Sequence, residues 1–219
     1  MIFDYFKNKK LIILVIAILI LYPKILPTPI KTEGYALERI NTANEPYQKT
    51  SVKITPKIVV DKNKTIIIHF ICDYEVSALI VSKCNYWFDW KAKLIPIDLA
   101  LAWGHLVRAD YKKYINYWQF NRWYYYRYKG GSPWGGDYIA SHSSNHHLIP
   151  ANQNIRKAIQ SSKVNQIVKL TGYLVNLDMI STNGKEEQLL SSQSRTDTGG
   201  GACEVMYVTK VQIENNLYE

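Results

Sequence analysis

The sequence has few cysteines and none of the short motifs that usually announce a particular chemistry. Only three cysteines occur in 219 residues, too few for a scaffold built on disulfides. The zinc patterns His-Glu-x-x-His and Cys-x-x-Cys, the nucleophile elbow Gly-x-Ser-x-Gly, the P-loop and Gly-x-Gly-x-x-Gly are all missing. These absences exclude the motif-defined zinc, serine-hydrolase and nucleotide-binding classes. The chain that remains has an ordinary globular balance, with 47% hydrophobic and 21% charged residues.

A disulfide is an open question at one pair of positions. Cys72 and Cys84 are the nearest cysteines in the sequence, and Cys203 lies far from both. A tight turn at Asp73–Val76 would place Cys72 opposite Ser77 rather than opposite Cys84. The sequence therefore does not favour the pairing, although an oxidising compartment would permit it.

The N-terminus carries one long apolar run, from Leu11 to Tyr22. Twelve helical residues rise only about 18 Å, but residues 6–26 with their flanking lysines are long enough for a hydrocarbon layer of roughly 30 Å. No small-residue cleavage site follows the run. Residues 1–26 are therefore predicted to be a cytoplasmic tail and a transmembrane anchor, with the membrane as partner of residues 6–26.

The distribution of charge predicts the orientation of that anchor and argues against nucleic acid as a partner. The lysines before the apolar run predict a cytoplasmic N-terminus, a single pass through a bacterial inner membrane and a periplasmic or extracytoplasmic domain. Residues 1–32 hold five lysines and one aspartate, which leaves only +5 of the net charge of +9 for the rest. Nucleic acid is therefore not an expected partner. Residues 27–50, rich in proline at their start, are predicted to be a stalk.

Residues 51–219 are predicted to form an α+β domain, a compact and mostly antiparallel β-barrel-like fold with one to three short helices. Alternating stretches such as TIIIHFICDY predict strands. Helices are predicted at IPIDLALAWG, after Asp110, and after the capping residue Asn152, with Ile155, Ala158 and Ile159 as its apolar face. A glycine inside a strand, at Gly172, is typical of small closed barrels related to OB or SH3-like forms.

The stretch SHSSNHHLIPAN, residues 141–152, holds the first candidate site. His142 and His146 are four residues apart and are candidate metal ligands and catalytic residues, with zinc as the candidate cofactor. Ser141, Asn145 and both histidines are candidate ligand-binding residues. The many serines and asparagines favour a loop whose side chains bond its own backbone.

The stretch SRTDTGGGACE, residues 194–204, holds the second candidate site. Its glycines can form an anion-binding nest, and Arg195 can donate two hydrogen bonds to an anion. Asp197 can orient an imidazole. Cys203 is either a nucleophile or a buried residue that only packs in the core. We expect both stretches to share one pocket, with Trp103 in its wall. The aromatic, basic segment between Tyr111 and Lys129 either stacks on a ligand or packs on the sheet.

Four stretches together resemble a family of uncharacterised bacterial proteins that combine one N-terminal membrane anchor with an exported domain. They are WFDWKAKLIPIDLALAWG, YIASHSSNHHLIPAN, IVKLTGYLV and SRTDTGGGACEV. The resemblance spans most of residues 66–213. It implies a location outside the cytoplasm and a recurring pair of motifs, but it assigns no catalytic residue.

Two functions follow from these observations. The first is a membrane-anchored binding or assembly module, whose partner is an anionic or carbohydrate ligand or another protein of the cell envelope. The alternative is an extracytoplasmic hydrolase that uses the histidines of residues 142–147, with or without a metal.

Overall fold

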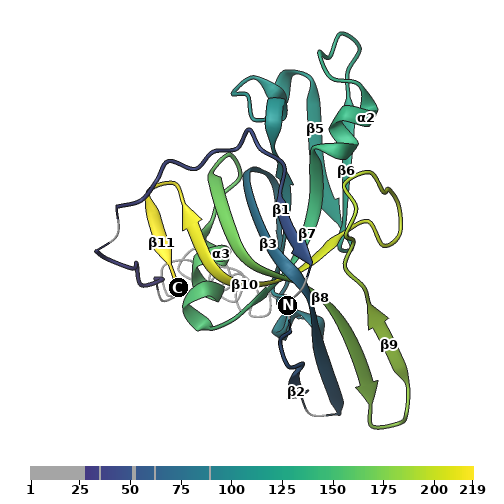
Figure 1. The fold of residues 1–219 in the computed structure, drawn as a ribbon. Helices are drawn as coiled ribbons and strands as arrows, with labels where there is room; N and C mark the ends of the chain where they lie inside the picture. Colours follow the sequence, from purple (N-terminus) through teal and green to yellow (C-terminus); the bar gives the residue numbers. More distant parts are fainter. Residues whose placement is uncertain (1–27, 35, 51–52, 62, 89) are drawn as a thin grey trace, which may run out of the picture.

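Five strands close into a barrel at the centre of the computed structural model, which describes residues 28–34, 36–50, 53–61, 63–88 and 90–219 (Figure 1). These strands are β3 (Lys64–Asn85), β4 (Ile97–Ala102), β7 (Ser143–Pro150), β8 (Ile167–Ser181) and β10 (Glu204–Ile213). β3 pairs with β4, β4 with β7, β7 with β10, β10 with β8, and β8 again with β3. The ring closes because β3 is long enough to pair with β8 along most of its length and with β4 at its end.

The order of the barrel strands identifies the fold. Numbered along the chain, the five strands follow one another around the barrel as one, two, three, five, four, and the third and fifth run parallel. A helix, α3 (Gln153–Ser161), connects the third strand with the fourth. This is the Greek-key arrangement of the OB-fold, and it confirms the predicted barrel.

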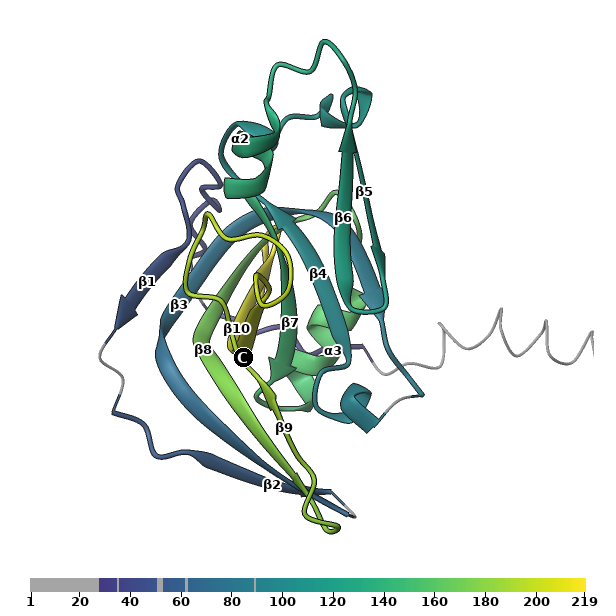
Figure 2. The ribbon, with the colours of Figure 1, turned by 90° about the vertical axis from the view of Figure 1, so that its right-hand side faces the viewer.

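The other elements extend or cover this barrel. β1 (Tyr47–Thr50) and β2 (Lys57–Asp61) pair with β3, β9 (Glu186–Leu189) pairs with β8, and β11 (Asn216–Tyr218) pairs with β10. Between β4 and β7 the chain inserts a hairpin of β5 (Ile115–Phe120) and β6 (Trp123–Tyr128), followed by α2 (Gly136–Ser141). The hairpin stands beside β4 (Figure 2). Short 3-10 helices complete the list: η1 (Trp90–Lys93), η2 (Gly104–Leu106) and η3 (Tyr111–Lys113).

The helix predicted after Asn152 is confirmed as α3. Asn152 accepts a hydrogen bond from the backbone N–H of Ile155 at 2.9 Å, as an N-cap should. Ile155, Ala158 and Ile159 are buried against the barrel interior. Asn154 on the same helix exchanges hydrogen bonds with the backbone of Ile30.

Two other predicted helices are wrong. IPIDLALAWG forms strand β4, and the segment after Asp110 forms only η3 before entering β5. All six residues of β4 are buried, because Leu99 and Leu101 face the barrel interior while Ala100 and Ala102 lie under the hairpin. A strand covered on both faces reads as a continuous apolar run, which sequence periodicity does not distinguish from a buried helix.

The predicted fold class is corrected as well. Strands make up 48% of the described residues and helices 13%, so the domain is mostly β rather than α+β. Among the described residues no helix has the length and apolar character needed to cross a membrane, so the transmembrane helix is not supported. The predicted anchor, residues 6–26, lies outside the described residues.

Residues 28–34 and 36–50, the described parts of the stalk predicted at residues 27–50, lie along the domain. Thr32 donates a backbone hydrogen bond to Leu217, Gly104 donates one to Thr42, and β1 pairs with β3. All three cysteines lie in the described part of the chain and are free thiols. The turn predicted at Asp73–Val76 is also wrong, since β3 continues through it.

Gly172 provides a test of the barrel geometry. A Cβ atom at this position would stand 2.0 Å from the backbone oxygen of Tyr207, on the neighbouring strand β10. We predict that Gly172→Ala lowers the free energy of unfolding by at least about 2 kcal/mol, because the obstacle is backbone that cannot rotate away. Chemical denaturation followed by tryptophan fluorescence measures the change. The matched control is Gly130→Ala, where nothing lies within 4 Å; equal effects of both changes would contradict the close approach.

Candidate functional site

The histidine stretch forms strand β7, not the predicted loop. Ser143–Pro150 pairs with β4 on one side and with β10 on the other, and its residues from Ser143 to Ile149 are buried. In a β-strand, successive side chains point to opposite faces, so those of β7 alternate between the barrel interior and its outer face. Ser144 and His146 face the barrel interior, whereas Asn145 and His147 face outward.

The inward-facing histidine belongs to a buried polar cluster. Nε2 of His146 lies 3.0 Å from the Tyr74 hydroxyl, which also accepts a hydrogen bond of 3.1 Å from Arg195. Arg195 forms an ion pair with Glu204, the residue opposite His146 on β10. Burial lowers the pKa of His146 to about 3 and raises the pKa of Glu204 to about 7. His146 is therefore neutral and inaccessible, which argues against the predicted catalytic or metal-binding role.

His142 lies elsewhere, at the C-terminal end of α2. Its Nδ1 is 3.0 Å from the Ser141 hydroxyl and 3.1 Å from the backbone oxygen of Tyr138. Its ring stacks on the Tyr138 ring at a centroid distance of 3.8 Å. Since His142 ends a helix and His146 lies inside a strand, their spacing of four does not put them on one face. The described residues contain no group of three potential metal ligands, and we assign no zinc site.

The outward-facing histidine has a buried carboxylate beside it. His147 lies opposite Asp98 of β4, and its Nδ1 is 2.9 Å from Oδ1 of Asp98. Tyr86 donates a hydrogen bond of 2.9 Å to the other oxygen of Asp98, and the Arg122 guanidinium lies 3.6 Å from Oδ1. These contacts hold the carboxylate in place next to the imidazole.

The charge of His147 follows from these neighbours. Burial alone would lower its pKa, but the Asp98 carboxylate beside it, with Cys203 close by, raises the pKa to about 9. His147 is consequently an imidazolium at neutral pH.

Cys203 stands at the entrance to β10, on the same outer face as Asn145 and His147. Its Sγ is 3.7 Å from Nδ2 of Asn145, and the amide of Asn145 is oriented by Gln119, whose Nε2 donates to Oδ1 at 2.7 Å. The side chain is partly exposed. Asp98, His147 and Cys203 thus form a row across three neighbouring strands, a carboxylate, an imidazole and a thiol in that order.

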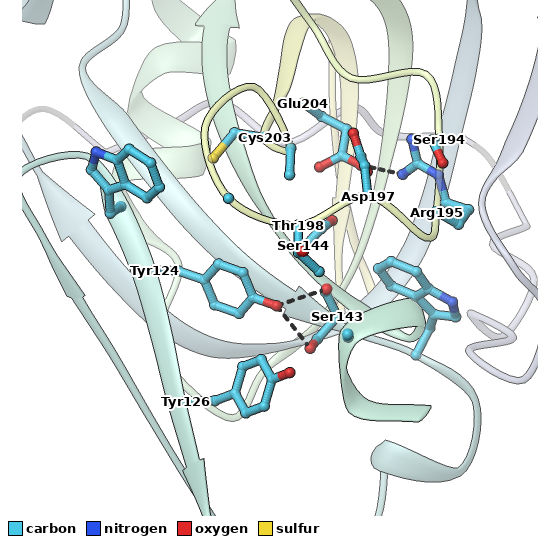
Figure 3. Close-up of a pocket in the computed structure, with 15 residues that line it drawn as sticks. Tyr124, Tyr126, Ser143, Ser144, Ser194, Arg195, Asp197, Thr198, Cys203 and Glu204 are labelled. Atoms are coloured by element: carbon cyan, nitrogen blue, oxygen red, sulfur yellow. Dashed lines mark hydrogen bonds and ion pairs between the residues drawn. The ribbon is translucent and has the colours of Figure 1, made fainter. Parts of the chain in front are cut away.

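Two cavities meet at Cys203. The first, of about 170 Å³, is the pocket between the hairpin, the start of β7 and the glycine-rich stretch of residues 194–204 (Figure 3). Its lining includes Trp103, Tyr124, Ser144, Arg195, Asp197 and Glu204. The second, of about 350 Å³, is lined by His147, Ile95, Leu189, Leu190 and Gly199 among others. Cys203 and Trp123 line both.

The structure therefore brings the two predicted stretches together, but with different residues at the centre. Trp103, Arg195, Asp197 and Cys203 line the first cavity. Ser141, His142 and His146 are engaged with other groups, and Asp197 accepts a hydrogen bond from Ser192 at 2.7 Å rather than from an imidazole. Sequence reasoning did not identify Asp98 as a site residue, and it included His147 only as one of the histidines of residues 142–147. Period-two alternation applied to SSNHHLIP would have separated His147 from His146.

Comparisons of this chain with protein-family models, with curated proteins and with solved structures found no match.

The Asp98–His147 contact has a measurable pH dependence. Because the folded state raises the pKa of His147 from 6.5 to about 9, the contact stabilises the fold fully below pH 6.5 and loses this contribution as the pH rises through about 9. We predict that unfolding free energy falls between pH 7 and 9, by about 3 kcal/mol at most. Asp98→Asn should abolish this fall and lower the pKa of His147, which NMR titration of its ring protons measures.

The control for this prediction is Asp178→Asn. Asp178 pairs with His69 on the exposed surface, at 2.8 Å, and should leave the titration of His147 unchanged. A His147 that still titrates near pH 9 in Asp98→Asn would contradict the assignment of its charge to Asp98.

Proposed function

We propose that this protein is a thiol-dependent hydrolase of acyl esters or amides, with Cys203 as nucleophile. The observation that carries the proposal is the row Cys203, His147, Asp98 beside two cavities. A nucleophile next to a base that is itself oriented by a third group is the general arrangement of covalent acyl transfer. Following the sequence resemblance, we place this activity outside the bacterial cytoplasm.

Each residue has a defined part in the reaction. With Nδ1 of His147 turned to Asp98, Nε2 is the ring nitrogen left for Cys203. The Cys203 sulfur attacks the carbonyl carbon and forms a carbon–sulfur bond, the acyl–oxygen or acyl–nitrogen bond breaks, and His147 passes the thiol proton to the leaving alcohol or amine. Water then attacks the thioester and gives a proton to His147, and the carbon–sulfur bond breaks to release the acid.

A binding module is the second candidate, favoured by the outer face of the hairpin. Trp118, Phe120, Trp123 and Tyr125 are exposed there, and the rings of Trp118 and Tyr125 stack at 5.5 Å. The segment from Tyr111 to Lys129 has five basic residues and no acidic one. Such a face suits a carbohydrate or an anionic ligand, and it does not require a reactive cysteine.

Alkylation distinguishes the two candidates. We predict that iodoacetamide modifies Cys203 at neutral pH at least about tenfold faster than Cys84, because His147 supplies a positive charge to only one of these partly exposed thiols. Intact-protein and peptide mass spectrometry measure both rates in the same sample. His147→Gln should bring the Cys203 rate down to that of Cys84, and equal rates in the wild-type protein would reject the nucleophile.

Ester hydrolysis tests the same assignment. Cys203→Ala should abolish hydrolysis of p-nitrophenyl acetate, and His147→Gln should lower kcat/KM about 100-fold or more. Cys84→Ala is the matched control and should leave the rate unchanged. Melting curves show whether each variant is folded; a folded Cys203→Ala protein with full activity would overturn the proposal.

A further inference from the structure

The lining of the second cavity carries basic side chains. Lys91, Arg122 and His147 all line it, and no aspartate or glutamate does so among the residues that the structure describes. The first cavity has a mixed lining, because Arg195 is accompanied there by two acidic residues. A hollow lined by one sign of charge raises the local concentration of ligands of the opposite sign. The second cavity therefore favours an anion.

The turn of the hairpin places one of these cations. Asn121 and Arg122 connect β5 with β6, and both have a positive φ, of 49° and 65°. Glycine and asparagine are the residues that such a turn favours, so Arg122 occupies its position at a conformational cost. Its guanidinium stacks 3.9 Å from the centroid of the Tyr86 ring and donates to the backbone oxygen of Ile95 at 3.4 Å. These contacts hold the guanidinium at the wall of the cavity.

The carboxylate behind this wall does not neutralise the cations. Oδ1 of the fully buried Asp98 faces both Nδ1 of His147, at 2.9 Å, and the guanidinium of Arg122, at 3.6 Å. Within this group one negative charge is shared by two positive ones. Lys91, on η1, adds a further cation, and its ammonium has three N–H groups, so it can serve a ligand in the cavity alongside a partner in the protein. Glu187 on β9 has a lysine partner at 2.8 Å.

We infer that the second cavity binds an anionic group of the substrate, a carboxylate or a phosphate, carried next to the bond that Cys203 cleaves. Cys203 lines the same cavity, so a ligand held by Lys91 and Arg122 lies beside its sulfur. The aliphatic side chains of Ile95 and Leu189, in the same wall, cover the carbon atoms that link the anion to the scissile carbonyl. The cleavage rests on the proposed function, whereas the affinity for an anion does not.

Two alkylating reagents that differ in charge test the inference on the full chain. Iodoacetate and iodoacetamide both react with thiolates, so the ratio of their rates at one cysteine does not depend on how much of that cysteine is ionised. We expect the ratio of the iodoacetate rate to the iodoacetamide rate at Cys203 to exceed that of N-acetylcysteine amide, an uncharged free thiol, by at least about tenfold. Peptide mass spectrometry measures both rates.

Charge variants at Lys91 assign this preference to the cavity. Lys91→Glu should lower the ratio at Cys203 about tenfold, and Lys91→Arg, which keeps the charge, should retain it. Lys163→Glu is the matched control, at an exposed lysine that lines neither cavity, and should leave the ratio unchanged. Melting curves show whether each variant is folded. A wild-type ratio equal to that of the free thiol, or a ratio that a folded Lys91→Glu protein retains, would overturn the inference.

Competition identifies the anion. Succinate and inorganic phosphate are each compared with sodium chloride at the same ionic strength for their ability to slow the reaction of Cys203 with iodoacetamide. Stronger protection by phosphate assigns a phosphate group to the substrate, and stronger protection by succinate assigns a carboxylate. Protection by neither anion would contradict the inference.

The outcomes separate the inference from the proposed function. The adipate half-ester of p-nitrophenol should be hydrolysed at least about fivefold faster than p-nitrophenyl hexanoate, a neutral ester of the same chain length. Hydrolysis of both esters through Cys203 at equal rates would overturn the inference and leave the nucleophile standing. A preference for iodoacetate in a protein whose Cys203 forms no acyl-enzyme would support the anion site and overturn the proposed function.

Discussion

The pairing of β7 with a strand on each side decides where every polar residue of the histidine stretch points. Both backbone edges of β7 are occupied, by β4 and by parallel β10, so the strand cannot slip without breaking two ladders. Alternation then places His146 inside the barrel and His147 outside it. Two adjacent histidines consequently have opposite properties: the pKa of one is lowered to about 3 and that of the other is raised to about 9.

The interior cluster explains why the barrel tolerates charges at one end. Arg195 and Glu204 form an ion pair whose side chains are mostly buried, and Tyr74 and His146 complete the hydrogen bonding. Removal of one member of such a pair typically costs about 3–5 kcal/mol, because the other charge is left buried alone. Arg195 lies in the glycine-rich stretch of residues 194–204. The ion pair therefore fixes this stretch to Glu204, the first residue of β10, which directly follows Cys203. The position of the thiol thus depends on a contact on the opposite face of the strand.

Sequence reasoning reached the barrel but reached only part of the site. Alternation identified β3, the capping residue Asn152 identified α3, and Gly172 indicated a closed barrel, because each of these signals is local. The helix predicted at IPIDLALAWG failed since the hairpin covers the outer face of β4, which no local pattern reveals. The histidine stretch was assigned to a loop because serine and asparagine favour loops. In the structure two of these side chains contact the hairpin: Asn145 accepts a hydrogen bond from Gln119, and the Ser143 hydroxyl lies 3.3 Å from the Tyr124 hydroxyl. Asp98 was not recognised as a site residue, because its partner His147 lies on a strand almost fifty residues further along the chain.

The hairpin is an insertion between the second and third barrel strands, and this separates two kinds of residue. Asp98 and His147 lie on strands that close the barrel, and Cys203 directly precedes another. Trp123 and Tyr124, which form the outer walls of the cavities, belong to the hairpin. Substitutions in the hairpin can therefore reshape the walls of both cavities without altering the strands that carry Asp98 and His147 or the entrance to β10 at Cys203.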